Sequence, residues 1–376
     1  MKRQISMQNS RGQSAFGALL AILFCLCPYC TLAAETTVSR MRSEDGSLSA
    51  PASGVDALYW LALSGSADAA LSLKSIHTRD AATVKSVKIP LSSELQSAVA
   101  IGGIAFLGNA LYAPIITKGA NAYVVKLSVD GQILASVSLG KAQRIALKAL
   151  AGKVFAFGST GSEGFIADIS PAGNAVTQNM KIAHSIAILD IEELQQKIVA
   201  YGLSQQADQR REVGTLTLID RELSQILLIK QVACGATALA VANGQVFIAC
   251  NRQNYSTEPG LVLLGYDKKF SQTSNYFLKN FRRPSLAVGV GNISGNGDKV
   301  FVTSVEDTVP TVVKVDIANG EESPFKVAAR QEMFSINPIS VQYFGERLIV
   351  ANGATQASPG NLRKHTFFIE ALALNP

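Results

Sequence analysis

Side chains that carry oxygen recur at every second position of one short segment, Gly291–Asp298 (GNISGNGD), directly before an apolar run. They are Asn292, Ser294, Asn296 and Asp298. Calcium loops use this alternation, because Ca²⁺ is bound by several oxygen ligands from closely spaced residues. Only Asp298 is a carboxylate, so we expect weak Ca²⁺ binding or none. A hairpin loop rich in Gly and Asn is the alternative interpretation.

Three histidines follow the N-terminal region, and no two of them have the spacing H-x-H or H-x-x-x-H. The sequence therefore gives a histidine metal site no local support. His184 directly precedes a predicted strand, and a histidine that lines a channel there could act as a general base. A structural histidine held by a hydrogen bond is the alternative.

Basic side chains gather in the polar segments between the apolar runs. They are Arg144, Arg210, Arg211, Arg252, Arg282, Arg283, Arg363 and Lys364, with Tyr255 close to Arg252. Arginine binds carboxylate or phosphate through two parallel hydrogen bonds, so this set predicts an anionic ligand or partner. The alternative is that these are ordinary solvated charges, offset by acids such as Asp208 and Glu258.

Several chemistries are excluded by missing motifs. The sequence has no G-x-S-x-G, no P-loop, no complete G-x-G-x-x-G and no C-x-x-C beyond residue 34. Basic residues are not interleaved with exposed aromatics, so a nucleic-acid partner is not expected. The sequence favours a non-enzymatic role, and it predicts no cofactor other than the weak Ca²⁺ candidate.

Two cysteines, Cys234 and Cys250, lie beyond residue 34. A tight hairpin at Asn243–Gly244 would place Thr237 opposite Cys250. Cys234 would then be about 10 Å away along the strand, which is too far for a disulfide. A bulge or bend at Gly235 would close this distance. The sequence leaves both a disulfide and two buried thiols open.

One apolar pattern recurs seven times, at intervals of 43 to 54 residues. The copies begin at Ala57 (ALYWLALS), Ala110 (ALYAPIIT), Lys153 (KVFAFGST), Lys197 (KIVAYGLS), Gln245 (QVFIACNR), Lys299 (KVFVTSVE) and Arg347 (RLIVANGA). Each copy is rich in residues typical of buried strands. A period of about 40–50 residues with several strands per repeat is typical of a β-propeller.

Each repeat is predicted to form four antiparallel strands, of which the recurring run is the second and a more polar run is the fourth. We therefore expect an all-β, seven-bladed propeller, with six or eight blades as the alternatives. The first repeat lacks an evident first strand and the last lacks a fourth. An N-terminal strand that pairs with the last repeat would close the ring. Only Asp190–Gln196 (DIEELQQ) favours a helical turn.

Loops after the second and fourth strands of a blade emerge on one face of a propeller. The long polar loops of this chain, with most of the basic residues named above, fall in these positions. This face is therefore the predicted binding face.

The chain from residue 35 onward resembles exported bacterial propellers of the YVTN, NHL and quinoprotein-like kind. The resemblance rests on the repeat period and the strand order, and it implies the fold but no catalytic residues. Trp60 is the only tryptophan, so the docking motif of repeats that bind pyrroloquinoline quinone is missing. The segment Gly291–Asp298 resembles the FG-GAP loop of calcium-binding propellers, with Asn in place of its first carboxylates.

The N-terminal residues predict export. Lys2, Arg3 and Arg11 precede the apolar run Phe16–Cys27, and small residues follow near Ala34. We expect a signal peptide at residues 1–34, a linker with a closing strand at 35–54 and the propeller at 55–376. Removal of the signal lowers the formal charge from +6 to +3. An uncleaved signal that anchors the chain in a membrane is the alternative.

Three functions compete on this evidence. The first is a periplasmic or secreted scaffold that binds a protein or an envelope ligand through the loop-rich face. The second is a propeller-type hydrolase or lactonase with a metal or His184 in the channel. The third is a structural subunit of an envelope complex.

Overall fold

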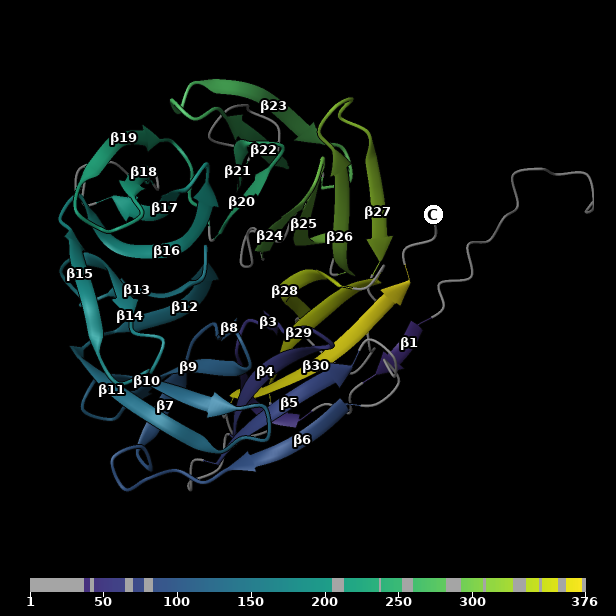
Figure 1. Cartoon of the computed structure of the whole chain (residues 1–376). Coiled ribbons are helices and arrows are strands. Elements are labelled where there is room, and N and C mark those ends of the chain that lie inside the picture. Colours follow the sequence, from purple (N-terminus) through teal and green to yellow (C-terminus); the bar gives the residue numbers. More distant parts are fainter. Residues whose placement is uncertain are drawn as a thin grey trace, which may run out of the picture. The chain divides into compact units, whose positions relative to one another are not determined.

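The computed structural model describes residues 37–40, 44–64, 70–77, 84–204, 213–236, 238–251, 260–281, 292–306, 309–326, 336–344, 347–357 and 363–373. The regular elements in these ranges are β-strands, labelled as in Figure 1. No helix in the same ranges is long and apolar enough to cross a membrane.

All seven copies of the recurring apolar pattern form strands. They are β4 (Ala57–Ser64), β9 (Ala110–Thr117), β13 (Lys153–Ser159), β17 (Lys197–Ser204), β21 (Gln245–Asn251), β25 (Lys299–Glu306) and β29 (Arg347–Ala357). Where side chains are described, these strands are buried on both faces, which is why they contain continuous apolar runs.

Four of the blades are four-stranded antiparallel sheets in chain order. Blade 3 contains β12 (Arg144–Leu150), β13, β14 (Gly164–Ile169) and β15 (Val176–Ile182). Blade 4 contains β16 (Ser185–Leu194), β17, β18 (Gly214–Asp220) and β19 (Ile226–Val232). Blade 5 contains β20 (Leu239–Ala242), β21, β22 (Leu261–Tyr266) and β23 (Gln272–Leu278), and blade 6 contains β24 (Asn292–Asn296), β25, β26 (Val309–Asp316) and β27 (Glu322–Lys326).

Blade 2 differs because its first strand is interrupted. It contains β7 (Ala98–Ile101), β8 (Ala105–Leu107), β9, β10 (Asn121–Ser128) and β11 (Ile133–Lys141). Both β7 and β8 pair with β9, so together they take the place of one first strand.

The sixth sheet corrects the prediction of seven blades. It contains β28 (Ile336–Phe344), β29, β30 (Arg363–Ala373), β1 (Thr37–Arg40), β2 (Glu44–Leu48), β3 (Ala52–Ser53), β4, β5 (Leu71–His77) and β6 (Val84–Ile89). The first and last repeats therefore share one nine-stranded sheet, and the propeller has six blades.

Strand β2 causes this fusion. Glu44 and Asp45 pair with β30, and the next residues, Gly46 to Leu48, pair with β4. Gly46 has φ of 133°, and a Cβ there would lie 2.1 Å from the carbonyl oxygen of Leu63, so only glycine fits this crossing point. The repeat count missed the fusion because β2 lies outside the repeated pattern.

The first strands line the centre of the ring. Successive contacts run through β3, β8, β12, β16, β20, β24 and β28, and Figure 1 shows these strands innermost. A Cβ on Gly102 would lie 1.8 Å from the carbonyl oxygen of Ile145 in β12, and one on Gly295 would lie 2.3 Å from that of Val241. Glycine at these positions lets neighbouring blades approach closely.

The outer strands of blades 2 to 5 share a β-bulge at the same place. One extra residue faces the third strand, namely Leu134, Thr177, Leu227 or Thr273. Bulges at an exposed edge hinder pairing with another chain. The recurrence indicates that the edges are protected by geometry as well as by polar side chains.

The helical turn predicted at Asp190–Gln196 is wrong. Residues up to Leu194 belong to β16, and Gln195 and Gln196 form the tight turn with φ of 50° and 60°. Ile191 and Leu194 are buried against the neighbouring strands, and the ladder with β17 continues to Lys197. Tertiary burial and strand pairing therefore override the local helical preference of Glu and Gln.

The two ends of the blades differ in loop length. First and second strands are joined by tight turns such as Ala151–Gly152, and third and fourth strands by short turns. The connections after second and fourth strands emerge at the opposite end and include the longest ones, such as residues 279–291. We call this end the loop face. Arg144 is the first residue of β12 and lies at this end.

We predict that Gly102→Ala destabilises the protein by about 1–3 kcal/mol, because its Cβ would overlap the Ile145 carbonyl of the next blade. The adjacent Gly103→Ala is the matched control, since its Cβ would meet only ordinary contacts of 3.4 Å or more. Urea denaturation of both variants measures the difference. Equal stabilities would contradict the close packing of the first strands.

Candidate functional site

A cluster of charged side chains lies between the first strands of blades 3 and 4. Lys148 Nζ on β12 contacts Asp190 Oδ1 at 3.0 Å and Glu192 Oε1 at 2.6 Å, both on β16. Asp190 also accepts hydrogen bonds from the backbone N–H groups of Ile191 at 2.8 Å and Leu239 at 3.1 Å. Because Leu239 begins β20, this one carboxylate connects three blades.

The pKa shifts follow from this arrangement. Burial opposes the charge on Lys148, but Asp190 and Glu192 outweigh burial and raise the pKa of Lys148. Burial is also the largest influence on Glu192, and together with Asp190 it raises the pKa of that carboxyl against the attraction of Lys148. Lys148, Asp190 and Glu192 keep 30, 14 and 27% of their side-chain surfaces exposed. Each charged side chain of the cluster is therefore paired with an opposite charge inside the cluster.

Arg144 lies on the same side of β12 as Lys148, because residues two and four apart in a strand share a side. Its side chain is exposed, and it makes no hydrogen bond or ion pair with any residue in the described ranges. The protein around this partly exposed side chain desolvates it, which lowers the pKa of Arg144, and Asp190 raises that pKa. The guanidinium nevertheless stays protonated. Since the oxygens of Asp190 are already bound, Arg144 is an uncommitted cation.

The first strands of the two neighbouring blades each have a β-bulge near their loop-face end. Val99 is the extra residue between Ala98 and Ala100 of β7, and Ile186 is the extra residue between Ser185 and Ala187 of β16. Val99 is 50% exposed and Ile186 is 39% exposed. Bulges often redirect a side chain beside a functional site.

The strand register places Val99, Arg144 and Ile186 at nearly the same distance from the loop-face ends of their blades. Arg144 pairs with Ser159, and Ala100 pairs with Ile116. Ser159 and Ile116 are each the seventh residue of an eight-residue copy of the recurring pattern. The Ser159 hydroxyl donates to the carbonyl oxygen of Ile186 at 2.6 Å, which joins blade 3 to blade 4 at this level. We call Val99, Arg144 and Ile186 the mouth patch. It groups an arginine of blade 3 with exposed aliphatic bulge residues of blades 2 and 4 near the loop face.

A second candidate lies at the other end of the blades. Lys153, Asp168, Thr177, Gln178 and Glu222 are among the residues that line a surface hollow of about 370 Å³. Lys153 Nζ contacts Asp168 at 3.1 Å and Glu222 at 2.7 Å, so the charges pair with each other. The hollow therefore offers a ligand fewer free groups than the mouth patch.

Most of the predicted basic residues lie outside the described residues. These are Arg210, Arg211, Arg252, Arg282 and Arg283, together with Tyr255. Arg363 and Lys364 begin β30 at the loop face, and their backbones pair with Ala357 and Gln356. Arg144 is the predicted basic residue whose side chain the structure describes.

The calcium candidate forms a strand followed by a turn. Asn292, Ser294 and Asn296 belong to β24 and pair with Thr303, Phe301 and Lys299 of β25. Alternate residues of a strand are about 6.6 Å apart, too far for one ion to be bound by all three. Asp298 follows in the turn. No three His, Cys, Asp or Glu side chains of the described residues lie together as a metal site requires.

The side chain of His184 contacts a strand of its own blade. Its Nε2 lies 2.8 Å from Thr217 Oγ1 on β18, the third strand of blade 4. Burial lowers the pKa of His184, so the neutral imidazole is favoured. No carboxylate among the described residues bonds to this ring. This geometry supports the structural interpretation of His184 over a general base.

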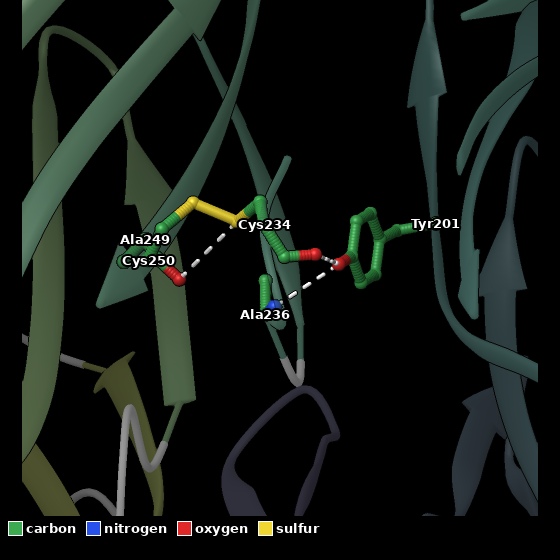
Figure 2. Close-up of a disulfide and its surroundings, with 5 residues drawn as sticks. All are labelled: Tyr201, Cys234, Ala236, Ala249 and Cys250. Carbon is green, nitrogen blue, oxygen red and sulfur yellow. Dashed lines mark hydrogen bonds between the residues drawn. A yellow bond between two sulfur atoms is a disulfide. The ribbon is translucent and has the colours of Figure 1, made fainter. Parts of the chain in front are cut away.

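Cys234 and Cys250 form a disulfide, with Cα atoms 5.3 Å apart (Figure 2). The predicted register of the Asn243–Gly244 hairpin is confirmed, since Leu239 pairs with Ile248 and Ala242 with Gln245. Before β20 the chain leaves this ladder, and the N–H of Cys234 donates to the carbonyl oxygen of Val232 at 2.9 Å. This tight turn brings Cys234 within reach of Cys250.

Tyr201 of blade 4 holds the same segment from the other side, as Figure 2 shows. Its hydroxyl donates to the carbonyl oxygen of Cys234 at 2.5 Å and accepts from the N–H of Ala236 at 3.0 Å. Tyr201 and both cysteines are fully buried in the core between blades 4 and 5. The disulfide and this tyrosine together fix the connection between the two blades.

Sequence reasoning missed Lys148, Asp190 and Glu192, and it missed Val99 and Ile186. Asp190, Ile191 and Glu192 alternate polar and apolar, which is a strand signal. Interpreting that segment as helical concealed the signal. The bulges at Val99 and Ile186 leave no mark in the sequence, because they depend on how two strands pair.

No protein-family model and no curated protein sequence matches the chain. Among solved structures, the Dos1 propeller superposes with a TM-score of 0.57 at 12% identity, covering 91% of this chain and 96% of that one. The propeller domain of the Trilobed protease from Pyrococcus furiosus has a TM-score of 0.55 at 13% identity, covering 87% and 94%. A chain of the mitotic checkpoint complex has a TM-score of 0.58 at 8% identity, covering 100% and 99%. These likenesses show that the chain is a β-propeller.

We predict that His184→Gln makes stability less sensitive to acid. The folded-state pKa of His184 is lowered, so the unfolded chain binds the proton more readily. Stability is therefore lost as the pH falls below about 6.5 towards the folded pKa. Chemical denaturation at pH 7.5 and pH 5 measures this loss, which should be smaller in the variant. Thr217→Val keeps the imidazole and serves as control. An unchanged loss in His184→Gln contradicts the prediction.

We predict that the double variant Cys234→Ala/Cys250→Ala loses about 3 kcal/mol of unfolding free energy, the value expected for a loop of 16 residues. A reductant should shift the urea transition of the wild type towards that of the variant and leave the variant unchanged. If the reductant shifts neither transition, the cysteines are free thiols.

Proposed function

We propose that this chain is an exported, non-enzymatic binding scaffold that holds an anionic ligand or partner at the channel mouth on its loop face. The observation that carries this proposal is the mouth patch. Near the loop-face ends of three first strands, an uncommitted guanidinium on blade 3 is at the same register level as exposed aliphatic residues on blades 2 and 4.

The contrast with the other charges supports this choice. Lys148, Asp190 and Glu192 bond to one another between blades 3 and 4, and Lys153 bonds to Asp168 and Glu222 at the end opposite the loop face. A charge without a partner beside exposed apolar surface favours binding of an outside group. His184 is bonded to Thr217 and faces no carboxylate in the described ranges, which favours binding over hydrolysis.

The disulfide supports the exported location. Disulfides persist in oxidising compartments and are rare where thiols are kept reduced. A bond between Cys234 and Cys250 therefore agrees with the N-terminal export signal expected from the sequence. We propose a periplasmic or secreted protein on these two grounds.

A photo-crosslinking residue placed at Val99 or Ile186 tests the proposed function in the organism that makes the protein. We expect one discrete crosslinked species, which Arg144→Gln abolishes. Leu227 is the matched control, because it is also a bulge residue of blade 4 and is also 39% exposed. Equal crosslinking at Leu227, or none at Val99 and Ile186, would contradict a binding role for the mouth.

A further inference from the structure

The surface hollow at the end opposite the loop face is lined mostly by polar side chains of blade 3. Its volume of about 370 Å³ is in the range of pockets that bind small molecules. Lys153 begins β13 and Asp168 lies on β14, while Glu222 belongs to the turn between β18 and β19 of blade 4. Pro171 adds apolar surface at the edge of the hollow.

A β-bulge lets two consecutive residues, Thr177 and Gln178, line this hollow together. Successive side chains of a regular strand point to opposite faces of the sheet. In β15, Thr177 is the extra residue of the bulge, and a bulge changes the direction of the side chains that it carries. Gln178 is directly opposite Asp168, so their side chains share one side of the sheet. A hydroxyl and an amide therefore join the carboxylate of Asp168.

The other blades show that the fold does not require this polar group. Blades 2, 4 and 5 have the same bulge, so the strand register identifies the residues equivalent to Asp168, Thr177 and Gln178. They are Lys126, Leu134 and Ala135 in blade 2, Leu218, Leu227 and Leu228 in blade 4, and Gly265, Thr273 and Ser274 in blade 5. Burial of a carboxylate costs free energy, and Asp168 is only 8% exposed. Because blade 4 folds with three leucines here, a role in binding explains the polar residues of blade 3.

The ion pairs in the hollow leave several hydrogen-bonding groups unused. Lys153 Nζ contacts Asp168 Oδ2 and Glu222 Oε2, and no residue that the structure describes bonds to the second oxygen of either carboxylate. An ammonium group has three N–H donors, and two of them serve these contacts. The side-chain amide of Gln178, which both donates and accepts, also has no partner within the described ranges. Donors and acceptors therefore lie side by side.

Charges of both signs surround the hollow, which disfavours an ionic ligand. Lys153 lies between the two carboxylates. Lys126 Nζ donates to the carbonyl oxygen of Pro171 at 2.6 Å, and the Arg221 guanidinium donates to that of Ala151. An anion would meet the two carboxylates, and a cation would meet these basic groups. A neutral ligand with hydroxyl groups avoids both repulsions, because a hydroxyl both donates and accepts hydrogen bonds.

From this arrangement we infer that the hollow binds a neutral carbohydrate. Its hydroxyl groups donate to the unused oxygens of Asp168 and Glu222 and accept from Lys153, and Gln178 bonds to a further hydroxyl. The C–H groups of the sugar ring cover Pro171 and remove apolar surface from water. This site is separate from the mouth patch, and the inference goes beyond the proposed function without resting on it.

Isothermal titration of the purified protein with glucose, galactose, mannose and N-acetylglucosamine tests the inference. We expect saturable binding of at least one sugar, with little dependence on salt because the ligand is neutral. Asp168→Leu installs the residue found at the equivalent position of blade 4 and should weaken binding about 10-fold or more, because a hydrogen bond to a charged group is lost. Gln178→Leu should weaken binding about 3- to 10-fold. The matched control is Gln231→Leu, which changes an exposed glutamine of β19 and should have no effect.

Three results would overturn the inference. They are no binding of any of the four sugars, binding that neither Asp168→Leu nor Gln178→Leu weakens, or tighter binding of phosphate or propylamine than of every sugar. Asp168→Asn keeps the shape of the side chain, and thermal denaturation of all variants checks that a loss of binding does not come from unfolding. Crosslinking at Val99 and Ile186 is measured at the other end of the blades, so failure here leaves the proposed function standing.

Discussion

Strand β2 pairs with β30 on one side and with β4 on the other, and the arrangement of the remaining blades depends on this double pairing. It joins the first and last repeats, which are almost 300 residues apart in the sequence, in one hydrogen-bonded sheet. Neither repeat then presents a free edge to the other. Gly46 makes the crossing feasible, since any Cβ there would overlap the Leu63 carbonyl.

Packing between the blades supplies most of the remaining order. Each sheet buries both faces against its neighbours, so the apolar clusters lie between blades rather than within them. Tyrosine hydroxyls add directional contacts. Tyr112 donates to the carbonyl oxygen of Pro171, Tyr201 to that of Cys234 and Tyr276 to that of Ile317, in each case in the following blade. Apolar burial is not directional, and these hydrogen bonds help to set the relative position of neighbouring sheets.

The charged groups on β12 and β16 are of two kinds. Lys148, Asp190 and Glu192 serve the structure, because each has its partner inside the protein. Arg144 has none among the described residues, although it extends from the same side of the same strand as Lys148. The difference follows from position along β16, since its acids at Asp190 and Glu192 lie farther from the loop face than the bulge at Ile186. An uncommitted cation held by a sheet is suited to binding, because little must be reorganised when a ligand arrives.

The sequence by itself determined the local features of this protein. The seven apolar runs form strands, the Asn243–Gly244 hairpin has the predicted register, and the longest connections emerge on one face. These features follow from side-chain period, turn chemistry and strand order, which are local properties of the chain. Only the tertiary structure decided the number of blades, the disulfide, the strand at Asp190 and the residues of the mouth. Each of these depends on which distant segments pair: β2 with two partners, Cys234 with Cys250 through a tight turn, and bulges that appear only when two strands align. Pairing between distant segments is set by the closure of the whole ring, and a local pattern does not contain that information.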